Sequence, residues 1–173
     1  MQSQPKNDPI NITEAESSTK WIFPTLPSDA VNQYVDFYHT FEVEDISSSP
    51  HLLISADTDY AVWLNGKMLG HGQYSDYPDQ KTYDTFSLEG LIRKGSNTLC
   101  VSVFYNGKDS SVYLRGEPGL FFQIHTGAEN ENIVAASGTD TLCRPNPCYH
   151  SGPIATVSNQ LFFTFGYDAQ KGV

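Results

Sequence analysis

The chain has 173 residues, of which 39% are hydrophobic, and it carries a formal net charge of −10 at pH 7. This length suits one all-β domain with a core of its own, and the ten Tyr and ten Phe residues favour strands. The acidic balance argues against nucleic acid or an anionic membrane as a partner, because both need clustered Lys and Arg. No apolar run approaches the roughly 20 residues that a membrane-spanning helix needs.

The first residues of the chain are polar. Residues 1–19 contain Pro5 and Pro9 and are predicted to form a flexible lead to a single domain over 20–173. They lack the apolar stretch of a secretory signal peptide. A start this polar also fits a mature sequence from which a signal has been removed.

The first long element is a strand predicted over residues 34–44, where apolar and polar residues alternate. One face of this strand carries Val35, Phe37, His39, Phe41 and Val43. Because His39 lies on that apolar face, we expect it to be a hydrogen-bonded core histidine rather than a ligand.

The segment 57–72 is the centre of the predicted fold. Tyr60, Val62 and Leu64 alternate with Ala61 and Trp63, which is strand periodicity, so one of the two sets is expected to be exposed. Asn65-Gly66 then predicts a type I′ turn, because both of its central residues need a positive φ. An apolar run over 52–54 precedes this hairpin and predicts another strand.

Further strands are predicted over 83–88, 98–105, 119–124 and 133–136. After residue 138 the chain is predicted to be loop-like through three prolines, before a last apolar stretch over 161–165. About eight strands at short spacing, with little sign of helix, predict an antiparallel β-sandwich of the jelly-roll type.

The three cysteines have different surroundings. Cys100 sits in an apolar strand pattern and is predicted to be a small buried hydrophobic residue. Cys143 and Cys148 flank a four-residue loop, so they could form a disulfide in an oxidising compartment or remain free thiols. A zinc site is not supported, because His150 is the only plausible third ligand nearby.

Catalytic residues are not predicted in this chain. Glycoside hydrolysis needs two carboxylates that face each other across a sugar. The candidate pairs are Asp57 with Asp59, Glu42 with Glu44, and Asp76 with Asp79. Aspartates at a corner commonly cap turns, and glutamates on the polar face of a strand are commonly solvated. No nucleophile elbow, zinc-protease motif or phosphate-binding loop is present.

Sugar binding is the chemistry that the sequence supports better. It needs flat aromatic faces for a pyranose ring and polar side chains for the hydroxyl groups. The loop over 72–83 contains three Tyr, two Asp and two Gln. The predicted carbohydrate-binding residues are Tyr74, Asp76, Tyr77 and Asp79, followed by Trp63 and Arg115. The alternative also stands that these tyrosines only pack loops onto the sandwich.

Calcium is the one cofactor for which the sequence offers ligands. Carboxylate and backbone carbonyl oxygens are the groups that it prefers. Asp57 and Asp59 are the candidate metal ligands, with Asp76 and Asp79 close in sequence, although the spacing of an EF-hand is absent. An ion held here would be structural rather than catalytic.

Several segments occur in a distinctive order along the chain. They are Trp21-Ile22, FEVE at 41–44, SADTDYAVWLNGKMLGHG at 55–72, YDTFSL at 83–88 and KGSNTLCVSVFYNG at 94–107. This order resembles the N-terminal β-sandwich domain of bacterial α-L-rhamnosidases of glycoside hydrolase family 78. The same core order is shared with galactose-binding-like jelly rolls of β-galactosidase-type enzymes. The chain departs from the rhamnosidase pattern where Gln170 replaces an Arg, and where Leu142 or Cys143 replaces a Trp.

The resemblance implies an accessory role. In that family the catalytic carboxylates lie in a separate α-helical barrel of several hundred residues, so this chain would be a non-catalytic part of a longer multidomain glycoside hydrolase. It would help to recognise a rhamnose-containing glycan, or pack against the remaining domains of the parent enzyme. The alternatives are a purely structural domain and a sugar-binding domain of a β-galactosidase-type enzyme. The expected location of the parent is periplasmic or extracellular.

Overall fold

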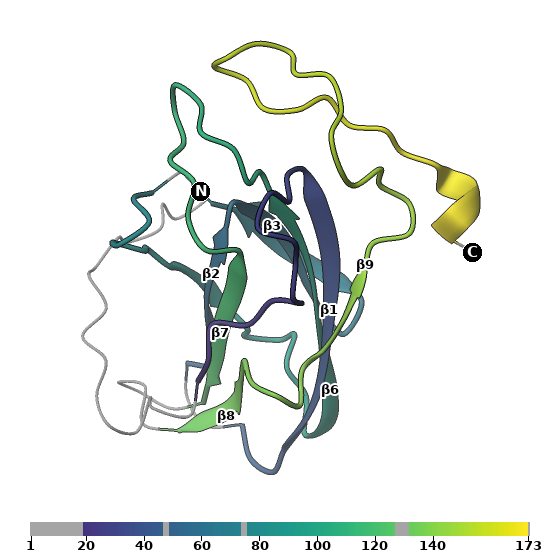
Figure 1. Ribbon diagram of the computed structural model, residues 1–173. Coiled ribbons are helices and arrows are strands. Elements are labelled where there is room, and N and C mark those ends of the chain that lie inside the picture. The colour runs from purple at the N-terminus through teal and green to yellow at the C-terminus, as the bar shows by residue number, and fades with distance from the viewer. Residues whose placement is uncertain (1–18, 47–48, 74–75, 127–131, 173) are drawn as a thin grey trace.

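The computed structural model describes residues 19–46, 49–73, 76–126 and 132–172. Two antiparallel sheets, of five and four strands, pack face to face and confirm the predicted β-sandwich (Figure 1). In the described residues the only helix is a short 3₁₀ turn, η3 (Ala169–Gly172). Nowhere in this part of the chain is there a helix long and apolar enough to cross a membrane. The flexible lead predicted over 1–19 falls almost wholly outside the described residues.

The five-stranded sheet contains the two longest strands. In spatial order its strands are β4 (Lys67–Gly72), β3 (Asp59–Leu64), β6 (Gly95–Tyr105), β1 (Gln33–Val43) and β9 (Leu142–Pro145). Strands β1 and β6 pair along their full length, from Gln33 opposite Tyr105 to Val43 opposite Gly95. This long central pair gives the sheet an extended outer face.

The second sheet closes the sandwich. Its strands in spatial order are β5 (Asp84–Ser87), β2 (His51–Asp57), β7 (Gly119–His125) and β8 (Ile133–Ala136). The chain crosses between the sheets at six connections, from β1 to β2, β2 to β3, β4 to β5, β5 to β6, β6 to β7 and β8 to β9, as in a jelly roll.

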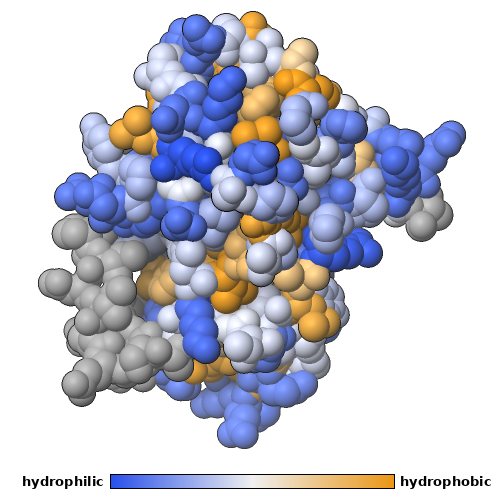
Figure 2. Space-filling view, viewed as in Figure 1, coloured by the Kyte–Doolittle hydropathy of each residue, from blue (hydrophilic) through white to orange (hydrophobic). Residues whose placement is uncertain are grey.

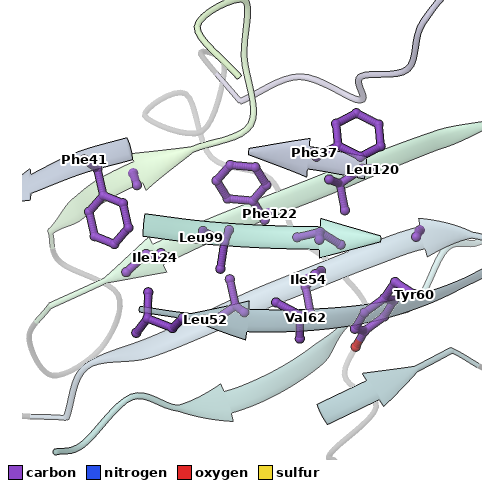
Figure 3. Packing of buried hydrophobic residues seen from close by; sticks show 14 of the residues in the cluster. Phe37, Phe41, Leu52, Ile54, Tyr60, Val62, Leu99, Leu120, Phe122 and Ile124 are labelled. Atoms are coloured by element: carbon purple, nitrogen blue, oxygen red, sulfur yellow. The ribbon is translucent and has the colours of Figure 1, made fainter. Parts of the chain in front are cut away.

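The core lies between the inner faces of the two sheets (Figure 3). Alternate residues of β1, β3 and β6 point into it, because successive side chains of a strand lie on opposite faces. Ile54, Val62 and Phe122 have no exposed area. Truncating such a side chain to Ala costs about 2–5 kcal/mol, through lost burial and the cavity left behind.

The Asn65-Gly66 turn has the predicted geometry. The φ angles of Asn65 and Gly66 are 51° and 78°, both in the left-handed region that a type I′ turn requires. The Asn65 amide also donates hydrogen bonds to the Leu91 carbonyl and to Asn97 Oδ1, at 3.1 and 2.9 Å. The Asn65 side chain therefore ties the hairpin to the first residues of β6 and to the turn before that strand.

His39 lies where the alternation predicts. Its side chain is buried and its Nδ1 lies 3.1 Å from Thr141 Oγ1. Burial lowers the pKa of His39, because the apolar surroundings disfavour its charged form.

One expectation about the C-terminal part of the chain is wrong, because strand β9 forms in a stretch predicted to be loop. In the apolar stretch 161–165, Phe163 forms an isolated bridge with Thr156. All four residues of β9 are exposed, so no alternation marks them. Their strand conformation comes from pairing with the edge of β1.

Candidate functional site

A groove of about 840 Å³ lies on the outer face of the five-stranded sheet. Its lining comes from four neighbouring strands, β3, β6, β1 and β9, and from the segment that follows β9. Strands β3, β6 and β1 have their inner side chains in the core, so the side chains that they present to the groove are mainly the outward-facing ones. Strand β9 is exposed along its whole length.

The register of the strands places the outward side chains in three rows that run across the sheet, because directly paired residues share a face. The first row consists of Trp63, Cys100, Tyr38 and Leu142. The central row consists of Ala61, Ser102, Asp36 and Arg144. The third row consists of Asp59, Phe104 and Tyr34. The central row starts with two small residues between rows that carry large rings, which leaves a hollow across the strands.

Aromatic rings form both walls of this hollow. Trp63 and Tyr38 belong to the first row, and the side chain of Tyr38 is 46% exposed. On the other side, the Tyr34 ring lies 4.9 Å from that of Phe104 and stacks on Tyr149, with centroids 4.3 Å apart and planes 11° from parallel. The groove therefore presents several ring surfaces on opposite sides of a floor of small residues.

The segment after β9 completes one wall and is fixed to β1 and to the residues that precede it. It is the yellow stretch that runs over the end of the sandwich in Figure 1. The buried amide of Asn32 donates to the carbonyls of His150 and Gly152, at 3.0 and 2.8 Å. Asn146 donates from its backbone to Tyr34 O and from its side chain to Asp36 Oδ1, both at 2.8 Å. Tyr149 is thereby held against Tyr34.

Polar groups stand among the rings. The carboxylate of Asp36 accepts the Asn146 hydrogen bond, and its other oxygen lies 3.8 Å from Arg144 Nε. Burial raises the pKa of Asp59 to about 6, and the negative charge of Asp57 adds to this effect. Burial, with Tyr149 and Asp59 nearby, raises the pKa of Tyr34 to about 12. The groove can therefore offer hydroxyl groups both hydrogen-bond donors and acceptors.

The structure places some of the sequence-predicted site residues in this groove. Trp63 lines it, and so does Asp59, one of the two predicted metal ligands. The prediction that Cys100 is buried is wrong, because its side chain lies on the outer face of β6, is partly exposed and also lines the groove. Cys143 and Cys148 line the groove as free thiols.

The predicted carbohydrate-binding loop lies away from the groove. Tyr74 is outside the described residues, whereas Tyr77 and Asp79 are exposed. Asp76 is occupied within the loop, where it accepts hydrogen bonds from Lys81 Nζ and the Thr82 backbone N–H, both at 2.8 Å. None of the three described residues lines the groove. Their part in sugar binding stays a prediction.

Arg115 also lies elsewhere. Its Nε donates to the Tyr105 hydroxyl at 3.2 Å, and its Nη2 donates to the Ser28 carbonyl. It lines a separate hollow of about 440 Å³, together with Trp21 and neighbouring residues. Arg115 therefore fastens the 28–30 segment to the end of β6 and does not meet Trp63.

Asp57, the other predicted metal ligand, already has protein partners. Its carboxylate accepts hydrogen bonds from Lys81 Nζ at 2.7 Å, the Tyr113 hydroxyl at 2.5 Å and Thr58 Oγ1 at 3.2 Å. Within the described ranges, no group of three or more His, Cys, Asp and Glu side chains is arranged to hold a metal ion. The charge of Asp57 is balanced by Lys81 in this structure.

Sequence reasoning missed most of the groove. Alternation puts Tyr34, Asp36 and Tyr38 on the polar face of the strand predicted over 34–44, and Tyr149 lies in the predicted loop after residue 138, but the sequence predicts no function for any of them. The structure brings all four to the groove. The available signal was the pair of tyrosines on the polar face of a strand, where solvated polar residues are more usual. Nothing in the sequence indicated that Tyr149 would stack on Tyr34, because 115 residues separate them (149 − 34).

Comparison with solved structures finds this fold in α-L-rhamnosidases. The chain matches a GH78 family rhamnosidase of Bacillus sp. GL1 over 88% of its length, with a TM-score of 0.81 and 24% identity. It matches the Streptomyces avermitilis α-L-rhamnosidase, complexed with L-rhamnose, over 82% of its length, with a TM-score of 0.62 and 23% identity. The matched region is only 16% and 14% of those two chains.

A lectin shows the same fold at lower similarity. The Pleurotus ostreatus lectin in complex with GalNAc matches 93% of this chain and 44% of its own, with a TM-score of 0.53 and 17% identity. No protein-family model and no curated protein matches the sequence. The chain thus shares its β-sandwich with one part of several α-L-rhamnosidases and with a lectin, which confirms the resemblance at the level of the fold.

Proposed function

We propose that the chain is a carbohydrate-binding accessory domain of an α-L-rhamnosidase-like glycoside hydrolase, and that the groove is its sugar site. The observation that carries this proposal is the arrangement of the outer face. Aromatic rings stand on both sides of a floor of small residues, with Asp36, Arg144 and Asn146 at one end.

This arrangement suits a sugar for two physical reasons. The C–H face of a pyranose packs against an aromatic ring, while its hydroxyl groups need hydrogen-bond partners within reach. The rings of Trp63 and Tyr38 provide the aromatic surfaces. The carboxylate of Asp36 and the guanidinium of Arg144 provide the hydrogen-bond partners. A paired sheet holds these groups in place before the ligand arrives, which reduces the entropy lost on binding.

The comparisons support a carbohydrate ligand and an enzyme parent. The related folds belong to rhamnosidases and a lectin, and two of those structures hold L-rhamnose and GalNAc. In this proposal a rhamnose-containing glycan binds the chain, and catalysis takes place in another domain of the parent. The purified chain is then expected not to hydrolyse an aryl α-L-rhamnoside, and sustained turnover would contradict the accessory role.

Isothermal titration with L-rhamnose and rhamnose-containing oligosaccharides, with and without calcium, tests the proposal. Trp63→Ala is expected to weaken binding by about 1–3 kcal/mol through the loss of one stacking face. Val112→Ala removes an exposed apolar side chain that does not line the groove and is expected to leave affinity unchanged. Binding that is equally strong in wild type and in Trp63→Ala would contradict the groove as the site.

One observation favours the alternative of a packing role. The segment after β9 exposes Val157, Leu161 and Phe165, by 59%, 58% and 71%. Figure 2 shows hydrophobic residues on the upper part of the molecule, where this segment lies. Such a cluster is typical of a surface that contacts other protein. If no saccharide binds the chain, packing against the remaining domains of the parent is the function that these residues support.

A further inference from the structure

We infer that the groove receives an extended oligosaccharide that lies across the strands, rather than a single terminal sugar. This inference rests on the proposed function and specifies the class of ligand that the same site takes. Its basis is the arrangement of residues in the three rows. The rows run across the strands, and this sets the direction and the length of the groove.

The length of the groove exceeds one sugar ring. The central row starts at Ala61 on β3, passes Ser102 and Asp36, and ends at Arg144 on β9. Neighbouring strands lie about 4.8 Å apart, so these three steps span roughly 14 Å. The volume of about 840 Å³ lies near the upper end of ordinary ligand pockets, which is more than a monosaccharide fills.

The stacking surfaces are spread along this length. Trp63 and Tyr38 lie in the same row but two strands apart, with Cys100 between them, which is roughly 10 Å by sheet spacing. At this strand spacing, each of the two rings is placed to pack against its own sugar unit. On the opposite wall, Phe104 and Tyr34 lie on adjacent strands. Two or more linked sugars would therefore use rings that one sugar leaves empty.

Hydrogen-bonding groups stand at both ends. The carboxyl group of Asp59 lies at the β3 end, in the row of Phe104, whereas Asp36 and Arg144 lie at the β9 end. The floor between them carries only the methyl group of Ala61 and the hydroxyl of Ser102. A ligand that reaches polar partners at both ends must pass over this floor, as a linear glycan does.

The experiment compares the affinities of saccharides of different length, and it uses a substitution that fills the floor of the groove. Titrations of L-rhamnose and of linear rhamnose-containing di- and trisaccharides are expected to show a Kd roughly tenfold lower for the trisaccharide than for the monosaccharide. Ser102→Tyr fills the middle of the floor and is expected to weaken trisaccharide binding at least tenfold. Tyr is favoured in strands, and Ser102 is partly exposed, so we expect this variant to fold. Its melting temperature checks that.

Ser96→Tyr is the matched control. Ser96 lies on the same outward face of the same strand, is exposed, and does not line the groove. This variant is expected to bind the trisaccharide like wild type. An equal loss of affinity in both variants would contradict the inference that the glycan passes over Ser102.

The remaining outcomes separate the inference from the proposed function. If L-rhamnose and the trisaccharide bind wild type with the same Kd, and Trp63→Ala weakens both, the groove is a sugar site for one terminal unit and the inference is wrong. If none of the saccharides binds wild type, the proposed function is wrong and the inference falls with it. The length comparison uses wild-type protein and does not depend on how Ser102→Tyr folds.

Discussion

The ammonium group of Lys81 lies 2.7 Å from a carboxylate oxygen of Asp57, whose side chain has no exposed area. The same ammonium lies 2.8 Å from Asp76, so one cation joins two carboxylates. Burial lowers the pKa of Lys81, but the hydrogen bonds and charges of both aspartates outweigh this effect and raise it overall. This group of three residues fastens the loop that precedes β5 to the corner between β2 and β3.

Replacing Lys81 with Met is expected to destabilise the fold by about 3–5 kcal/mol, because it leaves the buried charge of Asp57 without its cation. Urea unfolding at pH 7 measures the change. Lys67→Met removes a lysine that is exposed at the central hairpin and is expected to change stability by less than about 0.5 kcal/mol. If the two variants unfold at the same urea concentration, Lys81 does not balance Asp57.

Asn65→Ala is expected to cost about 2–4 kcal/mol. The variant loses the two donated hydrogen bonds and the one that Asn65 Oδ1 accepts from the Thr98 backbone N–H at 3.0 Å. It also forces an alanine into the left-handed region at φ 51°.

Asn65→Gly separates these two causes. Glycine adopts a positive φ at no steric cost, but it restores none of the hydrogen bonds. We expect it to destabilise the protein by about 2 kcal/mol in thermal unfolding. A glycine variant as stable as wild type would show that the Asn65 side chain contributes nothing to the fold.

The strands were predictable where one face is buried and the other exposed. In β1 and β3 the alternation of apolar and polar side chains shows which face of each strand lies in the core. The Asn65-Gly66 pair in the same way predicts the turn that follows β3. Strand β9 was not predictable, because its exposed residues carry no such pattern and its conformation depends on the edge of β1.

The groove was only partly predictable for a related reason. Trp63 was identified as a candidate, but its neighbours in the groove depend on the register of four strands. Asn146 and Asp36, which meet at one end of the groove, are 110 residues apart in the sequence. Likewise, nothing near Asp57 in the sequence shows that Lys81, 24 residues later, supplies its counter-charge.

A pair of single variants distinguishes the loop from the groove as the sugar site. Tyr77 is 65% exposed and lies outside the groove, so Tyr77→Ala is expected to leave both stability and sugar affinity within error of wild type. Trp63→Ala is expected to lower affinity with little change in melting temperature, because its ring lies on the outer face of β3. Titration and melting of both variants measure this. The reverse result would favour the loop that carries Tyr77 and Asp79.

Asp59 makes the stability of the fold depend on pH. Its pKa is raised from 3.8 to about 6, mainly by burial and also by the nearby Asp57, while a backbone hydrogen bond from Gln73 acts in the opposite direction. Between these two pKa values the folded protein binds more protons at this group than the unfolded chain does. The contribution of Asp59 to stability is therefore complete below about pH 4, falls as the pH rises, and is lost above about pH 6.

Asp59→Asn keeps the shape of the side chain but cannot ionise. We expect the free energy of unfolding of this variant, relative to wild type, to increase from pH 4 to pH 6 and then to level off. Urea unfolding of both proteins at half-unit intervals of pH gives this difference and cancels the groups that they share. Asp79→Asn, which removes an exposed carboxylate, is expected to show a flat difference over the same range. A flat difference for Asp59→Asn as well would mean that the Asp59 carboxyl remains solvated, and that the β3 end of the groove is open to water.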